Sequence, residues 1–399
     1  SLRLFINLFR YMFRRSPGFS VFTAIAACLI LLLVAYNSSL PVSWHDTHSY
    51  HLNAVKWAST YPAVPGLVNL HARLAYNSSF HLFAALTDVW ILRDRSAHVA
   101  LGFLLSMVSI QWLVCLTSAV RHRRDMLPKV FCMLTVPFLL AKIFSIEAAS
   151  LSTDLAVSLI CLVLMLEILR LPLIPLPWSK RQWVCSPRQY YFQLFLLCSL
   201  ATTIVAVKLS GLPLLIVVGL AALAVLTKKI APLSKMKLVA KHVFVLVSLP
   251  CVLLLGFFAR NAILSGWLLY PAPIGNMHLP WSAPLSEVLY QMDRIRSWAR
   301  IPGNTSSDEV LEHGFFHWFI PWFKTFVHSK ESRLLLAAGL GFRSRISNGP
   351  ELVISALRDK GCKEEESCRT DHLSELTPRE GAFGRSVRPL AGLALLAQP

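Results

Sequence analysis

An acid, three histidines and a tyrosine lie within seven residues in the stretch SWHDTHSYHLNAVKW, which begins where the first long apolar run ends. Asp46 is the acid, and Tyr50 and His51 follow it by four and five residues, so a helical stretch would place all three on one face. A carboxylate beside a hydroxyl can act as a general base toward an acceptor hydroxyl or amine. The alternative is a solvated acid near the lipid headgroups, and the neighbours of Asp46 are what favour chemistry.

A second acid, Asp154, stands in SLSTDLAVSL at the start of another apolar run. The serine and threonine before it are typical of a helix N-cap, so Asp154 could simply belong to the cap of that helix. It could equally join Asp46 in an active site. The sequence supports both interpretations.

Cations accompany these acids. His71 and Arg73 follow Asp46 in the same connection, Lys208 lies in the turn AVKLSGLP, and Arg260 and Asn261 stand in FFARNAILSGWLLYP. A basic side chain at the end of an apolar run can extend harmlessly to the membrane surface. Gathered in one place, however, these residues could bind a phosphate, for which arginine offers two parallel donors.

The elements that must position these residues are membrane helices. The chain of 399 residues is 55% apolar and only 15% charged, whereas ordinary soluble domains are about a quarter charged. Because roughly 20 apolar residues span a bilayer as a helix, we predict an all-α, polytopic transmembrane bundle of about seven spans. The spans are predicted at 19–38, 97–119, 130–146, 154–174, 190–207, 211–227 and 239–259.

Charge orients this bundle across the membrane. The connections at 1–18, 120–129, 170–189 and 228–241 hold 17 Lys/Arg against one acid, whereas those on the opposite side hold nine against ten. Basic loops stay in the cytoplasm, so we predict a multi-pass plasma-membrane protein whose Asp46 faces the extracytoplasmic side. The same bias accounts for most of the net charge of +18, and no nucleic-acid partner is needed.

Two extracytoplasmic segments, 39–96 and 260–332, are unusually long, and long connections beside compact spans often carry function. The first has helical periodicity with aromatic residues, which is typical of helices at the membrane interface. Near the end of the second, HGFFHWFIPWFKTFV is either an interfacial helix or the start of an eighth span. We predict a transmembrane domain over 1–332. Residues 333–399 gain charge and lose aromatic residues, and we predict a disordered or non-native tail.

Four motifs carry a resemblance to a known family. They are HDTHSYHLNAVKWASTYPAVPGLVNLHARL, SLSTDLA, VKLSGLP and ARNAILSGWLLYP, and they span about residues 40–275. They resemble a family of largely uncharacterised bacterial polytopic membrane proteins placed near the C-type glycosyltransferase (GT-C) superfamily. That superfamily contains the protein O-mannosyltransferases and the aminoarabinose transferases. The resemblance does not extend to the tail.

The resemblance implies a GT-C-like fold in which the acid of the first outer loop is the catalytic base or orients the acceptor, a role that carries over to Asp46. It also implies a sugar donor on a polyprenyl phosphate held by basic residues, and Arg260 and Lys208 are the matching positions. Relatives have further spans after the second long segment, and none follow here. The paired-acid metal motif of one branch is missing, since His48 stands where its second acid would be. No metal site is predicted, although a divalent cation held with Asp154 or a histidine stays open as a cofactor.

We therefore predict an inverting glycosyltransferase that moves a sugar from a polyprenyl-phosphate-linked donor in the lipid bilayer to a glycan, lipid or protein acceptor of the cell envelope. A transporter or lipid flippase is the main alternative, but the predicted spans are nearly free of charge and no internal repeat is visible. A non-catalytic scaffold for envelope assembly is the third. The predicted catalytic residues are Asp46 and Asp154, and the predicted substrate-binding residues are Tyr50, His51, His71, Arg73, Lys208, Arg260 and Asn261.

Overall fold

The structure is a computed structural model, and it describes residues 17–121, 126–171, 187–227, 236–303 and 307–328. These residues fall in the first of two units of the chain, Ser1–Ala338, while the second unit is Gly339–Pro399. The tail predicted at 333–399 lies outside the described residues.

A helix forms at every apolar run that the sequence predicts as a span. Within the described ranges all regular structure is helical, apart from one isolated β-bridge between Trp267 and Asn276. The long helices are α2 (Pro17–Ser38), α5 (Ser96–Arg121), α6 (Met126–Ile143), α7 (Thr153–Arg170), α8 (Pro187–Val207), α9 (Leu212–Val225) and α10 (Met236–Ser265).

Four of these helices are long and apolar enough to cross a membrane, namely α2, α5, α8 and α10. The described chain is therefore that of a helical membrane protein. The predicted number of seven spans would also require α6, α7 and the shorter apolar helix α9 to cross, and this number stays a prediction. One boundary differs clearly from expectation, because α10 continues to Ser265, six residues beyond the predicted end at 259.

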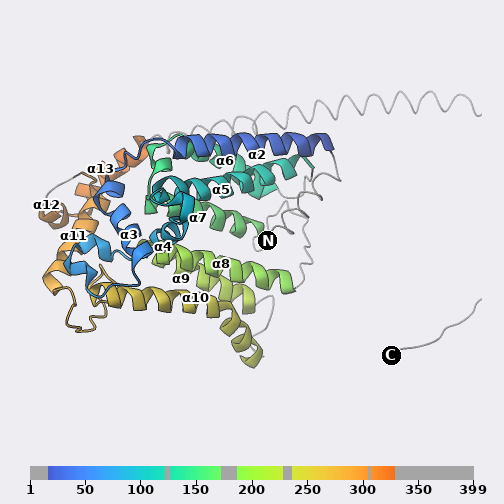
Figure 1. Ribbon diagram of the computed structural model, residues 1–399. Coiled ribbons are helices and arrows are strands. Elements are labelled where there is room, and N and C mark those ends of the chain that lie inside the picture. The colour runs from blue at the N-terminus through green and yellow to red at the C-terminus, as the bar shows by residue number, and fades with distance from the viewer. Residues whose placement is uncertain (1–16, 122–125, 172–186, 228–235, 304–306, 329–399) are drawn as a thin grey trace, which may run out of the picture. The chain divides into compact units, whose positions relative to one another are not determined.

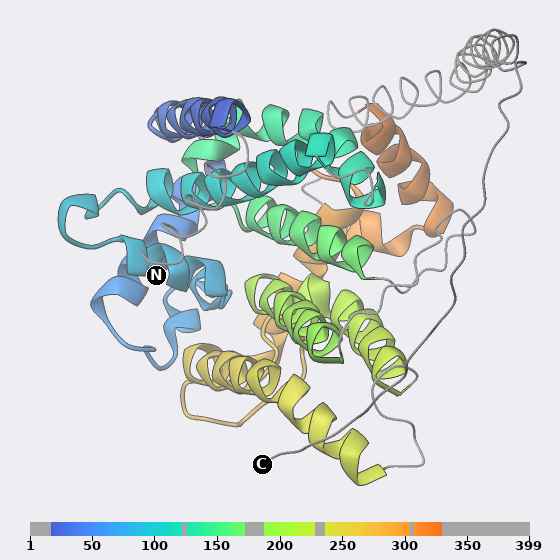
Figure 2. The same ribbon diagram turned by 90° about the vertical axis from the view of Figure 1, so that its right-hand side faces the viewer.

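The short helices gather at one end of the long ones (Figure 1). They are α3 (Leu52–Thr60), α4 (Ser79–Thr87), α11 (Leu285–Arg300), α12 (Ser307–Glu312) and α13 (Phe315–His328). The connections predicted to be extracytoplasmic all lie at this end, which we call the outer end. Seen from the side turned by 90°, α2, α5, α6 and α7 form one group and α8, α9 and α10 a second, with α7 packed against α8 (Figure 2).

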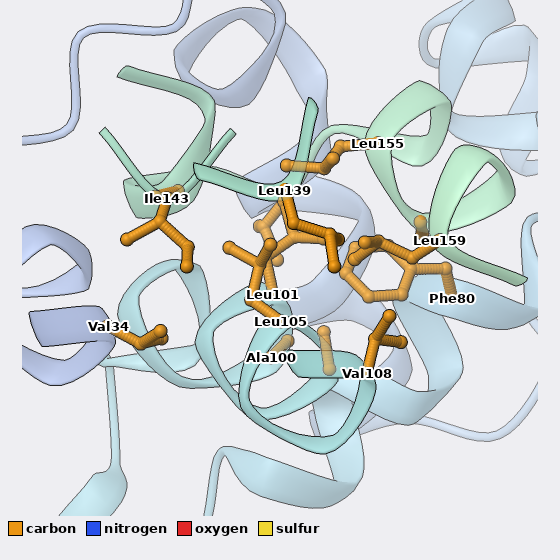
Figure 3. Packing of buried hydrophobic residues seen from close by; sticks show 14 of the residues in the cluster. Val34, Phe80, Ala100, Leu101, Leu105, Val108, Leu139, Ile143, Leu155 and Leu159 are labelled. Carbon is orange, nitrogen blue, oxygen red and sulfur yellow. The ribbon is translucent and has the colours of Figure 1, made fainter. Parts of the chain in front are cut away.

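The larger apolar core joins the helices of the first group. Figure 3 shows Leu101 and Leu105 of α5 facing Leu139 of α6 and Leu155 of α7, and Phe80 of α4 reaches the same cluster. Small residues let α2 and α5 approach closely, since a Cβ on Gly102 would lie only 2.6 Å from the Ser38 hydroxyl oxygen. Close packing of this kind holds membrane helices together where lipid tails are as apolar as the side chains.

A separate, smaller core builds the outer end. Leu67, Val68 and Leu74 from the first long segment are buried against Trp267 and Tyr270 from the second. The Tyr270 hydroxyl donates to the Ala72 carbonyl at 3.2 Å, and the Trp267 indole N–H donates to the Ala283 carbonyl at 2.9 Å. This core ties together two segments that are almost 200 residues apart in the chain.

Gly66 stands where these two segments come closest. Its φ of +70° lies in the left-handed region, and its N–H donates to the Ile263 carbonyl at 3.0 Å. A Cβ at this position would lie 2.7 Å from the Trp281 Cβ. No side chain can be added here without both backbone strain and a clash.

We expect Gly66→Ala to lower the free energy of unfolding by about 1–3 kcal/mol, because strain and overpacking add. The midpoint of thermal unfolding in detergent or nanodiscs measures this loss. Gly219→Ala is the matched control, since Gly219 lies in α9 with open space around it, and there alanine is neutral or favours the helix by up to about 1 kcal/mol. Equal midpoints for the two variants would contradict the packing described for Gly66.

Candidate functional site

Asp46 stands at the start of a helical turn that the sequence only partly anticipates. Residues Thr47–His51 form a π-helical turn, η1, that continues directly into α3. Thr47 and His51 of this turn are buried, whereas the side chain of Asp46 is 43% exposed. The stretch is therefore helical, as the hypothesis of a shared face requires, but His51 is buried in it while the Asp46 carboxylate stays partly exposed.

Arg73 brings a cation to this acid. Its Nη1 lies 3.6 Å from Asp46 Oδ1, and its Cζ lies 5.3 Å from the centroid of the Tyr50 ring, which places the guanidinium against an aromatic ring. Arg73 belongs to the short helix η3 (Ala72–Ala75), and the His71 Nδ1 accepts a hydrogen bond from the Arg73 N–H at 3.2 Å. His71 thus caps the turn that carries Arg73, so the structure gives it a positioning role.

The second acid is paired with a second cation. The N-cap of α7 is Ser152, whose hydroxyl accepts from the Leu155 N–H at 3.4 Å, so Asp154 lies in the first turn and does not cap the helix through its side chain. Asp154 instead forms an ion pair with Lys208, which precedes the short helix η6 (Leu209–Gly211) after α8. Both side chains of this pair are largely exposed.

A buried hydrogen bond joins the two acid-bearing connections. The Leu151 N–H donates to the Thr47 hydroxyl oxygen at 3.1 Å, and both residues are fully buried. Burial raises the pKa of Tyr50 well above its usual range, and the negative charges of Asp46 and Asp154 raise it further. Because Asp46 directly precedes Thr47 and Asp154 follows Leu151 by three residues, the hydrogen bond places the two acids in neighbouring parts of the outer end.

Two buried imidazoles lie beside Tyr50. The His51 ring meets the Tyr50 ring edge-on, with 4.3 Å between ring centroids, and the His81 ring of α4 is tilted against His51 at 4.7 Å. Neither ring nitrogen of His81, nor Nδ1 of His51, is in hydrogen-bonding geometry. Burial, with the nearby His81 and the charges of Arg73 and Lys208, lowers the pKa of His51 to about 2. Both rings are therefore neutral at pH 7.

His81 extends the site toward α10. Burial lowers the pKa of His81 to about 4, and the charge of Arg260 adds to this shift. Arg260 lies inside α10, where its Nη1 is 3.5 Å from Asn77 Oδ1, and the Asn77 amide donates to the Phe257 carbonyl at 2.9 Å. Among the described residues no carboxylate pairs with Arg260, in contrast to Arg73 and Lys208.

Asn261 is placed apart from this group. Its side chain is fully buried and its amide donates to the Leu268 carbonyl at 2.9 Å, so it supports the turn that follows α10. Sequence reasoning assigned it to the substrate and missed His81, Asn77 and Thr47, which do line or support the site. The one signal for His81 was a histidine inside the otherwise apolar stretch SFHLFAAL of an outer helix.

An apolar cavity of about 330 Å³ lies between α5, α7 and α8. On α7 its lining residues Leu159 and Val163 are five and nine residues past Asp154, roughly 8 and 14 Å along the helix axis. On α8 Leu200 lies eight residues before Lys208. The cavity is thus deeper in the bundle than the ion pair, on the same two helices. Its lining residues are Leu104, Met107, Val108, Ile110, Gln111, Leu159, Ile160, Val163 and Leu200.

A metal centre is not apparent in the part of the chain that the structure describes. No three His, Cys, Asp or Glu side chains gather there in a way that could hold an ion. Asp154, which the sequence analysis kept open as a contributor to a divalent-cation site, forms an ion pair with Lys208 instead.

Fold and site together define a helical membrane protein with a polar, doubly ion-paired cluster at one end of its bundle. The chain belongs to the family described as a domain of unknown function, DUF8201, which matches residues 2–342. No curated protein and no solved structure matches the chain.

The neutral imidazoles predict a pH dependence of stability. An unfolded His81 has an ordinary pKa of about 6.5, whereas the folded one has a pKa of about 4. As the pH falls below about 6.5, the unfolded chain therefore takes up protons first, and stability drops by up to about 1.4 kcal/mol per pH unit for each such ring.

We expect the unfolding midpoint of the protein to fall between pH 7 and pH 5, and His81→Gln to make that fall shallower. The measurement is thermal unfolding at both pH values. His45→Gln serves as control, because His45 is an exposed histidine beside the same turn. An unchanged pH dependence in His81→Gln would show that His81 is not held neutral by burial.

Proposed function

We propose that this chain is a membrane glycosyltransferase that moves a sugar from a polyprenyl-phosphate-linked donor to an acceptor of the cell envelope, at the extracytoplasmic face of the plasma membrane. The observation that supports it most is the presence of two carboxylate–cation pairs, from three separate segments, at one end of an apolar bundle. Such a site offers a base and phosphate-binding groups at the depth where a lipid-linked sugar presents its headgroup.

Asp46 takes the role of general base. Its carboxylate is partly exposed, and Arg73 and the turn η1 hold it in place. In the reaction the acceptor hydroxyl gives its proton to Asp46 while its oxygen forms a bond to the anomeric carbon. The bond from that carbon to the phosphate oxygen breaks at the same time, and the polyprenyl phosphate leaves with the electron pair. Tyr50 stays protonated and can donate a hydrogen bond to the sugar or the acceptor.

The cations stabilise the departing phosphate. Lys208 and Arg73 are already partly neutralised by their acids, whereas Arg260 is half-buried with only a distant amide oxygen as its partner in the described structure. A buried charge without a counter-charge is costly. An anionic ligand beside Arg260 would therefore gain more binding free energy than the same ligand beside Arg73 or Lys208. Preorganised positive charge at the site where negative charge develops lowers the barrier.

The apolar cavity between α5, α7 and α8 suits the lipid part of the donor. Its volume is at the low end of ligand pockets, which range over roughly 300–1,000 Å³. A polyprenyl chain that entered it would keep the phosphate at the outer end, because the cavity lies one to three turns deeper than Asp154 on α7.

Transport is less well supported. A translocation path places ionisable groups near the middle of the bilayer. In the described helices the charges inside α6 and α7 are near helix ends and are paired locally, Lys142 with Glu147 at 3.2 Å and Glu167 with Arg170 at 2.5 Å. Arg260, which has no carboxylate partner among the described residues, lies near the outer end of α10 instead.

We expect Asp46→Asn to reduce sugar transfer about 10²–10⁴-fold, the usual contribution of a general base, without loss of folding. The assay uses purified protein in liposomes with a panel of sugar-linked polyprenyl phosphates and envelope extract as acceptor. Asp94→Asn is the control, because Asp94 is an exposed acid of the same segment, 3.9 Å from Lys56. Sugar transfer at the unaltered rate in Asp46→Asn would show that Asp46 is not the general base.

Arg260→Gln tests donor binding separately. We expect it to weaken binding of polyprenyl phosphate in nanodiscs about 10- to 100-fold, because a charge-assisted hydrogen bond to the phosphate contributes roughly 1.5–3 kcal/mol. Arg296→Gln should bind like the unaltered protein, since Arg296 is exposed on α11 and faces Asp293 at 3.5 Å. Equal affinities for all three proteins would exclude Arg260 from the phosphate site.

A further inference from the structure

Helix α13 has one wide apolar face and one narrow polar face. At 100° per residue, its Phe and Trp residues and Ile320 cover somewhat more than half of the circumference, while His317, Lys324 and Thr325 lie opposite. The aromatic side chains are largely open, for example Phe316 at 72% exposure. In a water-facing helix such a surface would be strongly unfavourable.

The aromatic rings of α13 are ordered against one another. Phe315 stacks on Phe319 at 4.9 Å between centroids, Phe319 stacks on Phe323 at 5.9 Å, and Trp322 stacks on Phe326 at 5.6 Å with only 10° between the ring planes. These contacts lie within the helix, so they stiffen its apolar face without covering it.

Helix α13 projects from the bundle at the outer end. Figure 1 shows it among the short helices there, and Figure 2, turned by 90°, shows it at the rim rather than over the middle of the long helices. Its packing partner is α11, and the Arg300 guanidinium of that helix lies 5.4 Å from the Trp318 ring. Within the described structure, Phe315, Phe316, Phe323 and Phe326 of the aromatic face all remain at least half exposed.

The length of the apolar run decides between an interfacial helix and an eighth span. In the sequence the run FFHWFIPWFKTFV covers only 315–327, and SKESR at 329–333 carries three charges. A span needs roughly 20 apolar residues, so this run is too short. Amphipathic helices rich in Trp and Phe, with Lys on the polar face, are typical of the boundary between headgroups and acyl chains.

The lipid-facing surface of the long helices continues to the same level. Tyr36, near the outer end of α2, is 65% exposed, and Phe144, directly after α6, is 62% exposed. Exposed aromatic residues near the ends of membrane helices are typical of the bilayer interface, so the bilayer surface lies near the outer end if these helices cross a membrane. The aromatic face of α13 is therefore close enough to the bilayer surface to contact lipid.

We propose that α13 lies in the outer bilayer interface with its aromatic face among the acyl chains, and that it anchors the second long segment to the lipid surface. Helix α11 connects α13 to the candidate functional site. Gln291 of α11 accepts a hydrogen bond from the Tyr76 hydroxyl at 2.7 Å, and the Tyr76 ring lies 6.1 Å from that of Tyr50. Through these contacts, the depth of α13 in the lipid determines how far Tyr50 lies from the bilayer surface. The proposal does not depend on which reaction the site performs.

Depth-dependent quenching tests the location. A fluorescent amino acid is introduced by codon suppression at Phe316, Phe323 or Lys324, and the full chain is placed in liposomes. Nitroxide lipids labelled near the headgroup should quench the reporters at 316 and 323, and aqueous iodide should quench the one at 324. Strong quenching at 316 by lipids labelled near the chain end would indicate a spanning helix and overturn the proposal. Equal iodide quenching at all three positions, or protection from both quenchers by a covering protein, would overturn it too.

A paired set of variants tests the anchoring force. With the reporter at Phe326, the double change Phe316→Asp and Phe323→Asp should abolish lipid quenching, whereas His317→Asp on the polar face should leave it unchanged. Unfolding midpoints show whether each variant folds. Lipid quenching that survives in the folded double variant would mean that the aromatic face does not hold α13 in the membrane.

Discussion

The hydrogen bond from the Leu151 N–H to the Thr47 hydroxyl joins two connections that are 104 residues apart. It is buried on both sides, where an unpaired amide would cost about 1–3 kcal/mol, and it fixes the start of α7 against the turn η1. Asp46 precedes Thr47 by one residue and Asp154 follows Leu151 by three. The separation of the two ion pairs therefore depends on this single bond and on the apolar core beneath it.

Electrostatics follow from that geometry. Arg73, Lys208 and Arg260 all act on the buried pair of His51 and His81, and they help to keep both rings neutral. Two acids balance two of these cations, and the described residues leave Arg260 without an acid. In the proposed function, an anionic donor would supply the negative charge that Arg260 lacks, and it would also offset the positive charges that lower the pKa of the two imidazoles.

Two separate apolar cores stabilise this arrangement. The core between α2, α5, α6 and α7 sets the helices side by side, so it decides which connections share an end. The outer core around Trp267 and Tyr270 then locks the first long segment onto the second, so that Arg73 and Tyr50 have fixed positions. Helix α11 adds a further contact, because Gln291 accepts a hydrogen bond from the Tyr76 hydroxyl, and α13 lies against α11 through Trp318 and Arg300.

Apolar periodicity and charge bias were enough to predict the helices, their approximate ends and the grouping of the outer connections, because the hydrophobic effect and lipid surroundings act on each segment separately. The same sequence patterns do not predict which partners individual side chains have. Ser152 rather than Asp154 caps α7, Asp154 pairs with Lys208, and α10 continues past Arg260, so that Asn261 is buried. These outcomes depend on which helices pack together, and only the tertiary structure brings residues from distant segments within the few ångströms over which hydrogen bonds and ion pairs form.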